Sequence, residues 1–352
     1  MTRLKIVPDL SWLMTRSAFV KMVPLTCEVK WRDQPLLTGS VRVALESVIH
    51  VLEYVRQFEP SIKLSDYIFC DDCGPSWRKS VYPKYKIKRK KDEETQRILG
   101  DMFEMKRVFI CIMGALGVAT WHKPELEGDD VIAFVTKSRS KKKLKSLIYS
   151  TDLDLAQLIN SYTSMIKSVD DGLTTYGMKN LPWIKRVKIG KEQKCLDFQC
   201  GGDVVLYKAL CGDSSDGYSG VIGFGNVKWL KLIKIIHNDP KINSIGFLKK
   251  PIAACRYLES KHPELKNEFS KILEGIEQFN LCKKLAVLKP EIPIKSELWY
   301  RDPNVEKRED GGLGVVKKYI EFGNESQLEM IFNDFGMVNT YREFKNQVEL
   351  NW

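Results

Sequence analysis

Residues 147–154, with the sequence LIYSTDLD, place carboxylates directly after a short apolar run. The run from Leu147 to Ser150 is typical of a buried strand, and Asp152 follows it. The same order occurs twice earlier, at Leu4–Val7 before Asp9 and at Asp66–Cys70 before Asp71. Ligands of an open parallel sheet bind at the carboxyl ends of its strands. If these strands are parallel, the three carboxylates meet at one edge of the sheet.

Helical patterns separate the predicted strands. Val41–Phe58 and Glu93–Leu116 are amphipathic, and Asp129–Val135 opens a further helix. Strands that alternate with helices predict an α/β fold, in which a parallel sheet is flanked by helices. After about residue 200 the pattern changes to short helices joined by glycine-rich turns, which indicates a soft domain boundary.

The composition is that of a globular protein with a surplus of basic residues. The 352 residues carry a formal net charge of +11, and 43% of them are hydrophobic. Such a charge attracts nucleic acid, although a merely basic soluble protein has the same balance. No apolar run reaches about 18 residues, so we expect no membrane span. The nine scattered cysteines and the absence of a signal-peptide layout predict reduced thiols and a cytoplasmic location.

Further acidic residues occur in closely spaced groups along the chain. They are Glu127, Asp129, Asp130, Asp154, Asp213 and Asp216. Each alone is explained equally well as a helix cap or a turn residue. Gathered together they would repel one another unless a cation neutralised them. With only four histidines in the chain, oxygen ligands dominate, and these suit Mg²⁺ or Mn²⁺. Two such ions about 4 Å apart can cleave a phosphodiester.

Residues 77–91, WRKSVYPKYKIKRKK, interleave basic and aromatic side chains. Basic groups bind phosphates, and aromatic rings stack on unpaired bases. A solvated basic loop would have the same composition. The position of the segment directly after Asp71 favours contact with nucleic acid.

A glycine-rich stretch, LCGDSSDGYSGVIGFGNVK, covers residues 210–228 and precedes an apolar helix at Trp229–Ile236. Gly220, Gly223 and Gly225 permit a tight turn there. Free backbone N–H groups at the start of a helix bind phosphate. A turn without a ligand is the alternative, but the acids upstream and Lys228 downstream favour a binding role.

Five blocks in this order resemble the flap endonuclease family, in particular bacteriophage 5′-nucleases of the phage ribonuclease H type and the 5′-nuclease domain of bacterial DNA polymerase I. The blocks are IVPDLSWLMTRSAF, IFCDDCGPSWRKSVYPKYKIKR, ELEGDD, YSTDLDLAQLI and LCGDSSDGYSGVIGFG. They resemble the opening Asp block of the family, its Asp–Arg–Tyr-Lys–Arg block, Glu-x-Asp-Asp, Ser-x-Asp-x-Asp-x-x-Gln-Leu and Gly-Asp-x-x-Asp-Asn with the glycine turn. The resemblance covers roughly residues 4 to 290.

The resemblance implies a role for each matching residue. Two Mg²⁺ ions, or Mn²⁺ in their place, would be held by two sets of acids. The first set is Asp9, Asp71, Glu127 and Asp129, and the second is Asp152, Asp154, Asp213 and Asp216, with Asp130 between the two sets. Lys86 and Arg89 would lie over the scissile phosphate. The residues expected to contact the passing strand are Arg78, Lys84, Tyr85, Lys88, Lys90 and Lys91. The turn at Gly220–Gly225, together with Lys228, would grip duplex DNA, with a K⁺ ion at the hairpin.

The same resemblance implies the domain organisation. We expect a PIN-like catalytic domain at residues 1–200, with a basic helical arch at about 77–107. A helix-hairpin-helix subdomain would follow at residues 201–295. The segment 296–352 either binds a replication partner or packs on the body.

Three positions depart from the family pattern. Leu10 stands where the family has Gly, and Gly217 stands where it has Asn; Gly and Asn both tolerate a positive φ. Asp71 is followed by Asp72, and the spacing back from Arg78 favours Asp71 as the ligand.

The predicted function is that of a structure-specific 5′-nuclease, with flap endonuclease and 5′–3′ exonuclease activity in replication. Its partners would be DNA or an RNA–DNA hybrid with a 5′ end, and replication proteins such as single-strand-binding protein. We expect a monomer with no membrane partner. A PIN-type ribonuclease and a structure-specific nucleic-acid-binding protein without catalysis are the alternatives.

Overall fold

The computed structural model describes residues 4–20, 26–31, 34–37, 39–87, 92–169, 172–178, 183–189, 192–288, 325–334 and 337–347. Four strands form its main sheet: β1 (Lys5–Pro8), β6 (Ser146–Tyr149), β7 (Thr163–Val169) and β8 (Gly172–Tyr176). β1 pairs parallel to β6 and β6 parallel to β7, whereas β8 is antiparallel.

Two further strands extend this sheet beyond β1. β4 (Ile68–Cys70) pairs parallel to β5 (Ala119–Trp121). Parallel bridges from Ile6 to Tyr67 and from Asp9 to Cys70 join β4 to β1. The strand order is therefore β5-β4-β1-β6-β7-β8. The parallel arrangement predicted for the three strands that precede Asp9, Asp71 and Asp152 is confirmed.

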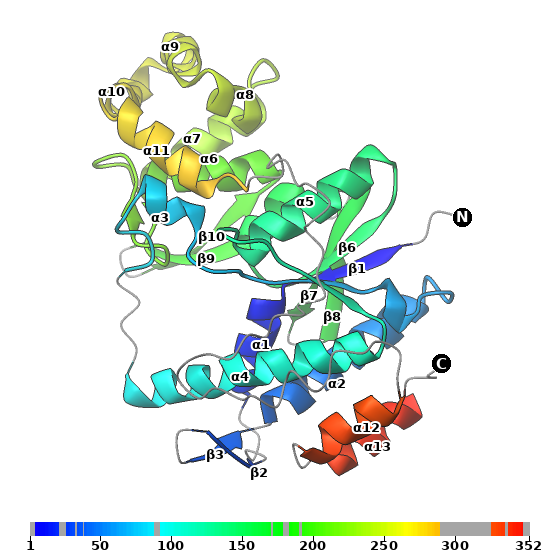
Figure 1. The fold of residues 1–352 in the computed structure, drawn as a ribbon. Helices are drawn as coiled ribbons and strands as arrows, with labels where there is room; N and C mark the ends of the chain where they lie inside the picture. The colour runs from blue at the N-terminus through cyan, green and yellow to red at the C-terminus, as the bar shows by residue number, and fades with distance from the viewer. Residues whose placement is uncertain are drawn as a thin grey trace.

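Helices cover both faces of the sheet (Figure 1). One face carries α1 (Leu10–Ala18), α2 (Gly39–Arg56) and α4 (Glu93–Ala115), and the other carries α5 (Gly128–Lys141). Successive residues of β1 face opposite sides: Ile6 is buried in the cluster with α1, α2 and α4, and Val7 in the cluster with α5. The sheet therefore separates two apolar cores.

The predicted helices agree with the structure to within about two residues at each end, except that α5 continues well beyond Val135. The strand predicted at Asp66–Cys70 was wrong in its first residues, because a 3₁₀ turn, η1 (Leu64–Asp66), precedes β4. The buried Asp66 carboxylate accepts hydrogen bonds from the Lys63 amide and from Lys5 Nζ, which holds this turn.

Two antiparallel ribbons were not predicted from the sequence. They are β2 (Thr26–Trp31) with β3 (Gln34–Leu37), and β9 (Trp183–Ile189) with β10 (Glu192–Phe198).

The helices between residues 201 and 286 gather into one lobe above α5 (Figure 1). They are α6 (Gly201–Cys211), α7 (Asn226–Asn238), α8 (Ser244–Lys249), α9 (Pro251–Lys261), the short 3₁₀ helix η3 (Pro263–Leu265), α10 (Lys266–Glu274) and α11 (Ile276–Ala286). Trp229, Phe247 and Phe269 are fully buried there and join the same apolar cluster as α5.

The described part of the C-terminal segment packs on the opposite side of the molecule (Figure 1). α12 (Glu325–Asp334) and α13 (Val338–Gln347) bury Leu328, Phe332 and Phe344 in the core that also contains α2 and α4. The prediction that this segment packs on the body is confirmed for these two helices. Within the described ranges, no helix has the length and hydropathy that a membrane span requires.

Candidate metal centre and nucleic-acid interface

The three predicted strand-end carboxylates lie at one edge of the sheet. Asp9 follows β1 and caps α1, and its Oδ1 accepts from the Trp12 amide at 3.0 Å. Asp152 follows β6 and caps the 3₁₀ helix η2 (Leu153–Leu158), where its Oδ1 accepts from the Asp154 amide at 2.8 Å. Caps fix these side chains on the backbone, so they are positioned without a ligand.

In the first set of acids, Asp9 and Asp71 are buried, and Glu127 and Asp129 are half-buried. The pKa of Asp9 is raised to about 8, mainly by burial and also by the charges of Asp72, Asp152 and Asp71, against the lowering effect of the hydrogen bond from the Trp12 amide. Burial also raises the pKa of Asp129 well above its usual range, with Asp152 and Asp9 adding to the effect. Oxygen donors that destabilise one another's charge match the requirements of a hard divalent cation. These residues therefore fit such an ion.

The structure separates the roles of Asp71 and Asp72. Asp71 is buried, and its Oδ1 accepts from Lys106 Nζ at 2.7 Å and from Ser11 Oγ at 2.9 Å. Asp72 is exposed, accepts from the Gly128 amide at 2.7 Å, and is the charge that raises the pKa of Asp9 most. The spacing from Arg78 favours Asp71, but exposure favours Asp72, because an ion that enters from solvent reaches Asp72 directly, whereas Asp71 is buried against Lys106 and Ser11.

In the second set of acids, a lysine side chain supplies the positive charge that pairs with the carboxylates. Asp154, Asp213 and Asp216 can bring ligand oxygens within 4.8 Å of one another. Lys208, a buried residue of α6, forms ion pairs with Asp154 and with Asp213, the latter at 2.5 Å. Burial raises the pKa of Asp154 to about 7 against the opposing charge of Lys208. At Asp213 burial acts in the same direction, but Lys208 and Ser215 override it and lower the pKa to about 2.

Lys208 was not identified from the sequence. A lysine in a helix usually lies on the solvated face, and its partner Asp154 is distant in the chain. The available signal was its position inside VVLYKAL, residues 204–210, an otherwise apolar run. A charged residue with apolar neighbours on both sides in a buried helix requires a buried group of opposite charge.

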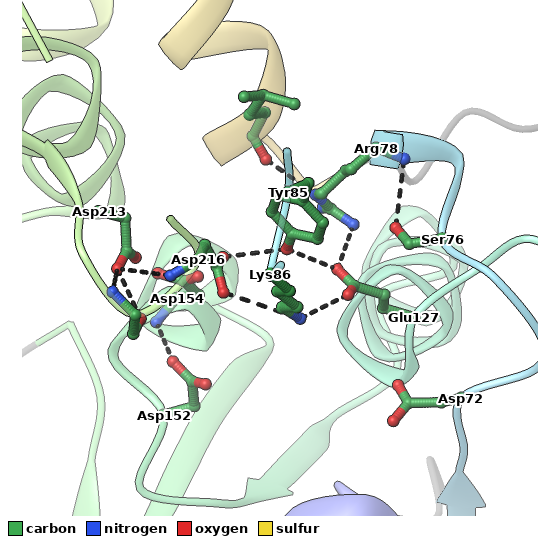
Figure 2. A network of polar contacts seen from close by, with 12 residues as sticks. Asp72, Ser76, Arg78, Tyr85, Lys86, Glu127, Asp152, Asp154, Asp213 and Asp216 are labelled. Carbon is green, nitrogen blue, oxygen red and sulfur yellow. Dashed lines mark hydrogen bonds and ion pairs between the residues drawn. The ribbon is translucent and has the colours of Figure 1, made fainter. Parts of the chain in front are cut away.

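Arg78 and Asp130 form a buried ion pair (Figure 2 shows Arg78). Arg78 is 2% exposed; Nη1 donates to Glu127 and to Asp130, both at 2.7 Å, and Nη2 donates to Asp130 at 3.0 Å. Trp77 Nε1 also donates to Asp130 at 3.0 Å. The guanidinium is thus paired inside the protein, and the contact of Arg78 with a nucleic-acid strand stays a prediction. Asp130 is paired by the same guanidinium, and its place between the two sets of metal ligands stays a prediction as well.

Tyr85 and Lys86 lie between the two sets of acids (Figure 2). Lys86 Nζ is 2.5 Å from Glu127 Oε1 and 3.8 Å from Asp216 Oδ1, and its amide donates to the Asp216 carbonyl at 2.7 Å. The Tyr85 hydroxyl lies 3.0 Å from Glu127 Oε2 and 2.9 Å from Asp216 Oδ2. Tyr85 is only 2% exposed, and its contact with a strand stays a prediction. Lys86 is partly exposed and remains available to a substrate.

Of the other basic residues predicted to contact nucleic acid in this segment, the structure describes one. Lys84 is exposed, in agreement with a role in binding. Four predicted residues, Lys88, Arg89, Lys90 and Lys91, lie outside the described residues.

The glycine turn leads into α7. At Gly220 a β-carbon would lie 2.2 Å from the Leu210 carbonyl oxygen, and Gly223 has φ +69°, so both positions require glycine. Gly225, in contrast, is the N-cap of α7 with φ −143° and has open space around its α-carbon. Lys228 Nζ donates to the Gly223 carbonyl at 2.5 Å, so a K⁺ ion at that oxygen would have to displace the ammonium.

Comparison with known proteins agrees with this architecture. Residues 18–187 match the family model for the 5′-3′ exonuclease, N-terminal resolvase-like domain. The chain is 27% identical over 248 residues to a 5′-3′ exonuclease of Mycoplasmopsis pulmonis, covering 70% of this chain and 71% of that protein. It is 24% identical over 279 residues to a thermostable DNA polymerase I of Thermus caldophilus, covering 77% of this chain but only 27% of the polymerase.

Two solved structures share the fold. One is the T5 5′-exonuclease with bound divalent metal ions (zinc), with a TM-score of 0.55 and 16% identity over 82% of this chain and 90% of that one. The other is the bacteriophage T5 flap endonuclease in a complex with DNA and metal ions, with a TM-score of 0.52 and 15% identity over 99% of both chains. At these identities the likeness concerns the fold. The family model and the curated relatives support the flap endonuclease and 5′–3′ exonuclease family as the group that this chain is similar to.

Proposed function

We propose that this protein is a metal-dependent, structure-specific 5′-nuclease that hydrolyses phosphodiesters at DNA flaps or RNA primers during replication. The observation that carries the proposal is the convergence of Asp9, Asp72 and Asp152 at the ends of three adjacent parallel strands. The names of the relatives, 5′-3′ exonuclease and flap endonuclease, support it. Because the chain matches only 27% of the polymerase, the proposal concerns the nuclease activity alone.

We propose that two Mg²⁺ ions, with Mn²⁺ as a substitute, bind between the two sets of acids. The first ion would take Asp9, Asp72, Glu127 and Asp129, and the second would take Asp152, Asp154, Asp213 and Asp216. When bound, such ions activate a water molecule and stabilise the leaving oxygen of a phosphodiester. The raised pKa values of Asp9 and Asp129 support this choice, since hard cations favour the charged carboxylates.

The protein's own cations orient these ligands. Arg78 holds Glu127 from the side of α3 (Trp77–Val81), and Lys208 holds Asp154 and Asp213 from α6. Lys86 lies at the junction of the two sets, where a negatively charged phosphate can replace its contact with Glu127. A positively charged group at that position stabilises the charge that develops on the reacting phosphate.

Nucleic acid would contact two surfaces. We assign the single strand near the 5′ end to the segment that contains Lys84 and Lys86, and the predicted Arg89 belongs to this assignment. The duplex part would lie against the glycine turn and Lys228. A K⁺ ion at the hairpin, a monomeric state, a cytoplasmic location and a partner such as single-strand-binding protein stay predictions.

Digestion of two labelled substrates tests the proposal directly. A 5′-labelled DNA flap and a nicked RNA–DNA hybrid are incubated with the protein in EDTA, Mg²⁺ or Mn²⁺, and product sizes are read on a gel. We expect cleavage near the 5′ end with either metal and none in EDTA. Asp152→Asn is the matched control, because it keeps the size of the side chain while removing its charge. It should lower the rate by orders of magnitude, roughly 10²-fold or more.

Cleavage that persists in EDTA would contradict the metal assignment. Tight binding of both substrates without cleavage under any condition would instead indicate a non-catalytic binding protein.

A further inference from the structure

Two lysines from different helices meet beside the glycine turn. Lys228 belongs to α7 and Lys271 to α10. Lys228 Nζ lies 2.5 Å from the carbonyl oxygen of Gly223. A β-carbon at position 223 would lie 3.0 Å from Lys271 Nζ. Both ammonium groups therefore reach the same residue of the turn, and Lys271 is absent from every motif identified in the sequence.

The arrangement is electrostatically unfavourable in the free protein. A hydrogen bond with Lys271 and its charge lower the pKa of Lys228, Lys231 adds to the repulsion, and Glu268 opposes it. An anion between the two amines converts that repulsion into attraction. The geometry is therefore that of a site whose ligand is negatively charged.

The surroundings match a nucleic-acid backbone. Ile222, at the tip of the turn, is 91% exposed, which is unusual for an isoleucine. Gly225 is the N-cap of α7 and has no side chain that could accept from the N-terminal amides of that helix. A cavity of about 340 Å³ at this place is lined by Gly223, Gly225 and Lys228 together with Ile189 of β9.

We propose that Lys271 and Lys228 together hold one backbone phosphate of the duplex part of the substrate. The proposal rests on the proposed function and adds a residue to it. Hydrogen-bonded amines are about 3 Å apart, so both can bind oxygens of a single phosphate. The pair thereby distinguishes duplex, which presents a phosphate at a fixed position, from a flexible single strand.

The test measures binding against salt concentration in EDTA, where no cleavage occurs. Fluorescence anisotropy gives Kd for a blunt DNA duplex and for one of its strands. The variants are Lys271→Ala, Lys228→Ala and the double substitution, with Lys266→Ala as control, because Lys266 is an exposed lysine on the same helix. Loss of one phosphate contact on B-DNA changes the slope of log K against log salt by about 0.9.

We expect each single variant to weaken duplex binding about tenfold and to flatten the slope by about 0.9. The double variant should flatten it by the same amount, since both lysines serve one phosphate. Single-strand binding and Lys266→Ala should match the wild type. Lys271→Arg should retain most of the affinity, which separates lost charge from misfolding.

Two results would overturn the proposal. Duplex binding by Lys271→Ala that equals the wild type would remove Lys271 from the site. A double variant with a slope change of about 1.8 would mean two separate phosphates. Either result leaves the nuclease activity intact, whereas failure of the proposed function would appear as a wild-type protein that does not cleave a flap in Mg²⁺.

Discussion

Replacing Lys208 with methionine tests how far this lysine neutralises the negative charge of the second set of acids. Lys208 is 6% exposed and neutralises Asp154 and Asp213. Methionine keeps the length of the side chain but removes the charge, which leaves two half-buried carboxylates without their ammonium partner. Removing one partner of a buried ion pair costs about 3–5 kcal/mol of unfolding free energy. We expect a loss of that size in EDTA.

Magnesium should recover part of this loss. An ammonium about 4 Å from a bound cation repels each of its unit charges by about 4 kcal/mol at an effective dielectric constant of 20. Without the ammonium, the carboxylates of Asp154 and Asp213 should bind Mg²⁺ at least about tenfold more tightly. Under saturating metal that difference adds about 1.4 kcal/mol to the stability.

Urea unfolding, followed by tryptophan fluorescence in EDTA and in saturating Mg²⁺ at equal ionic strength, measures both quantities. Lys5→Met is the matched control: Lys5 pairs with the fully buried Asp66 at the N-terminal ends of β1 and β4, away from the strand ends that carry the candidate ligands. It should lose stability in EDTA, but its gain from Mg²⁺ should equal that of the wild type. An equal Mg²⁺ gain in Lys208→Met and in the wild type would refute the reasoning.

Three further outcomes follow from the same geometry. The folded-state pKa of Asp9, about 8, is above its unfolded value of 3.8. Between about pH 4 and 8 the folded protein therefore keeps a proton that the unfolded chain has already lost, and the free energy of unfolding falls as pH rises. The thermal midpoint in EDTA should therefore fall as pH rises through this window, and saturating Mg²⁺ should flatten the curve; a midpoint that rises in EDTA would contradict it. Gly223→Val should weaken duplex binding in a folded protein, because φ is +69° and Lys271 is close; a duplex affinity equal to that of the wild type, measured by anisotropy, would show that the turn does not contact duplex. Lys86→Ala should lower the single-turnover cleavage rate at saturating substrate, while Lys84→Ala should raise only the dissociation constant; two variants that differ only in affinity would remove the catalytic role of Lys86.

The sequence predicted those parts of the fold and site that depend on local order. Short apolar runs followed by Asp9 and Asp152 indicated strand ends, and the parallel-sheet rule was sufficient to bring them together. Contacts between segments that are far apart in the sequence could not be predicted from this rule. Arg78 stands among basic residues that suggest a nucleic-acid surface, but packing of α3 against α5 gives it Asp130 as a partner. Sequence spacing likewise could not distinguish Asp71 from Asp72, because the difference depends on Lys106 reaching across from α4.

The division of the molecule into two cores affects how its integrity can be monitored. Each core packs against one face of the same sheet, and the candidate ligands lie at the ends of its strands. A spectroscopic probe such as the indole of Trp229 reports on the core beneath the helical lobe alone. Substrate turnover depends on both cores at once. A variant that weakens the packing of α12 and α13 should therefore lose turnover before the Trp229 signal changes, so that enzyme assays detect damage that the signal of this one residue does not report.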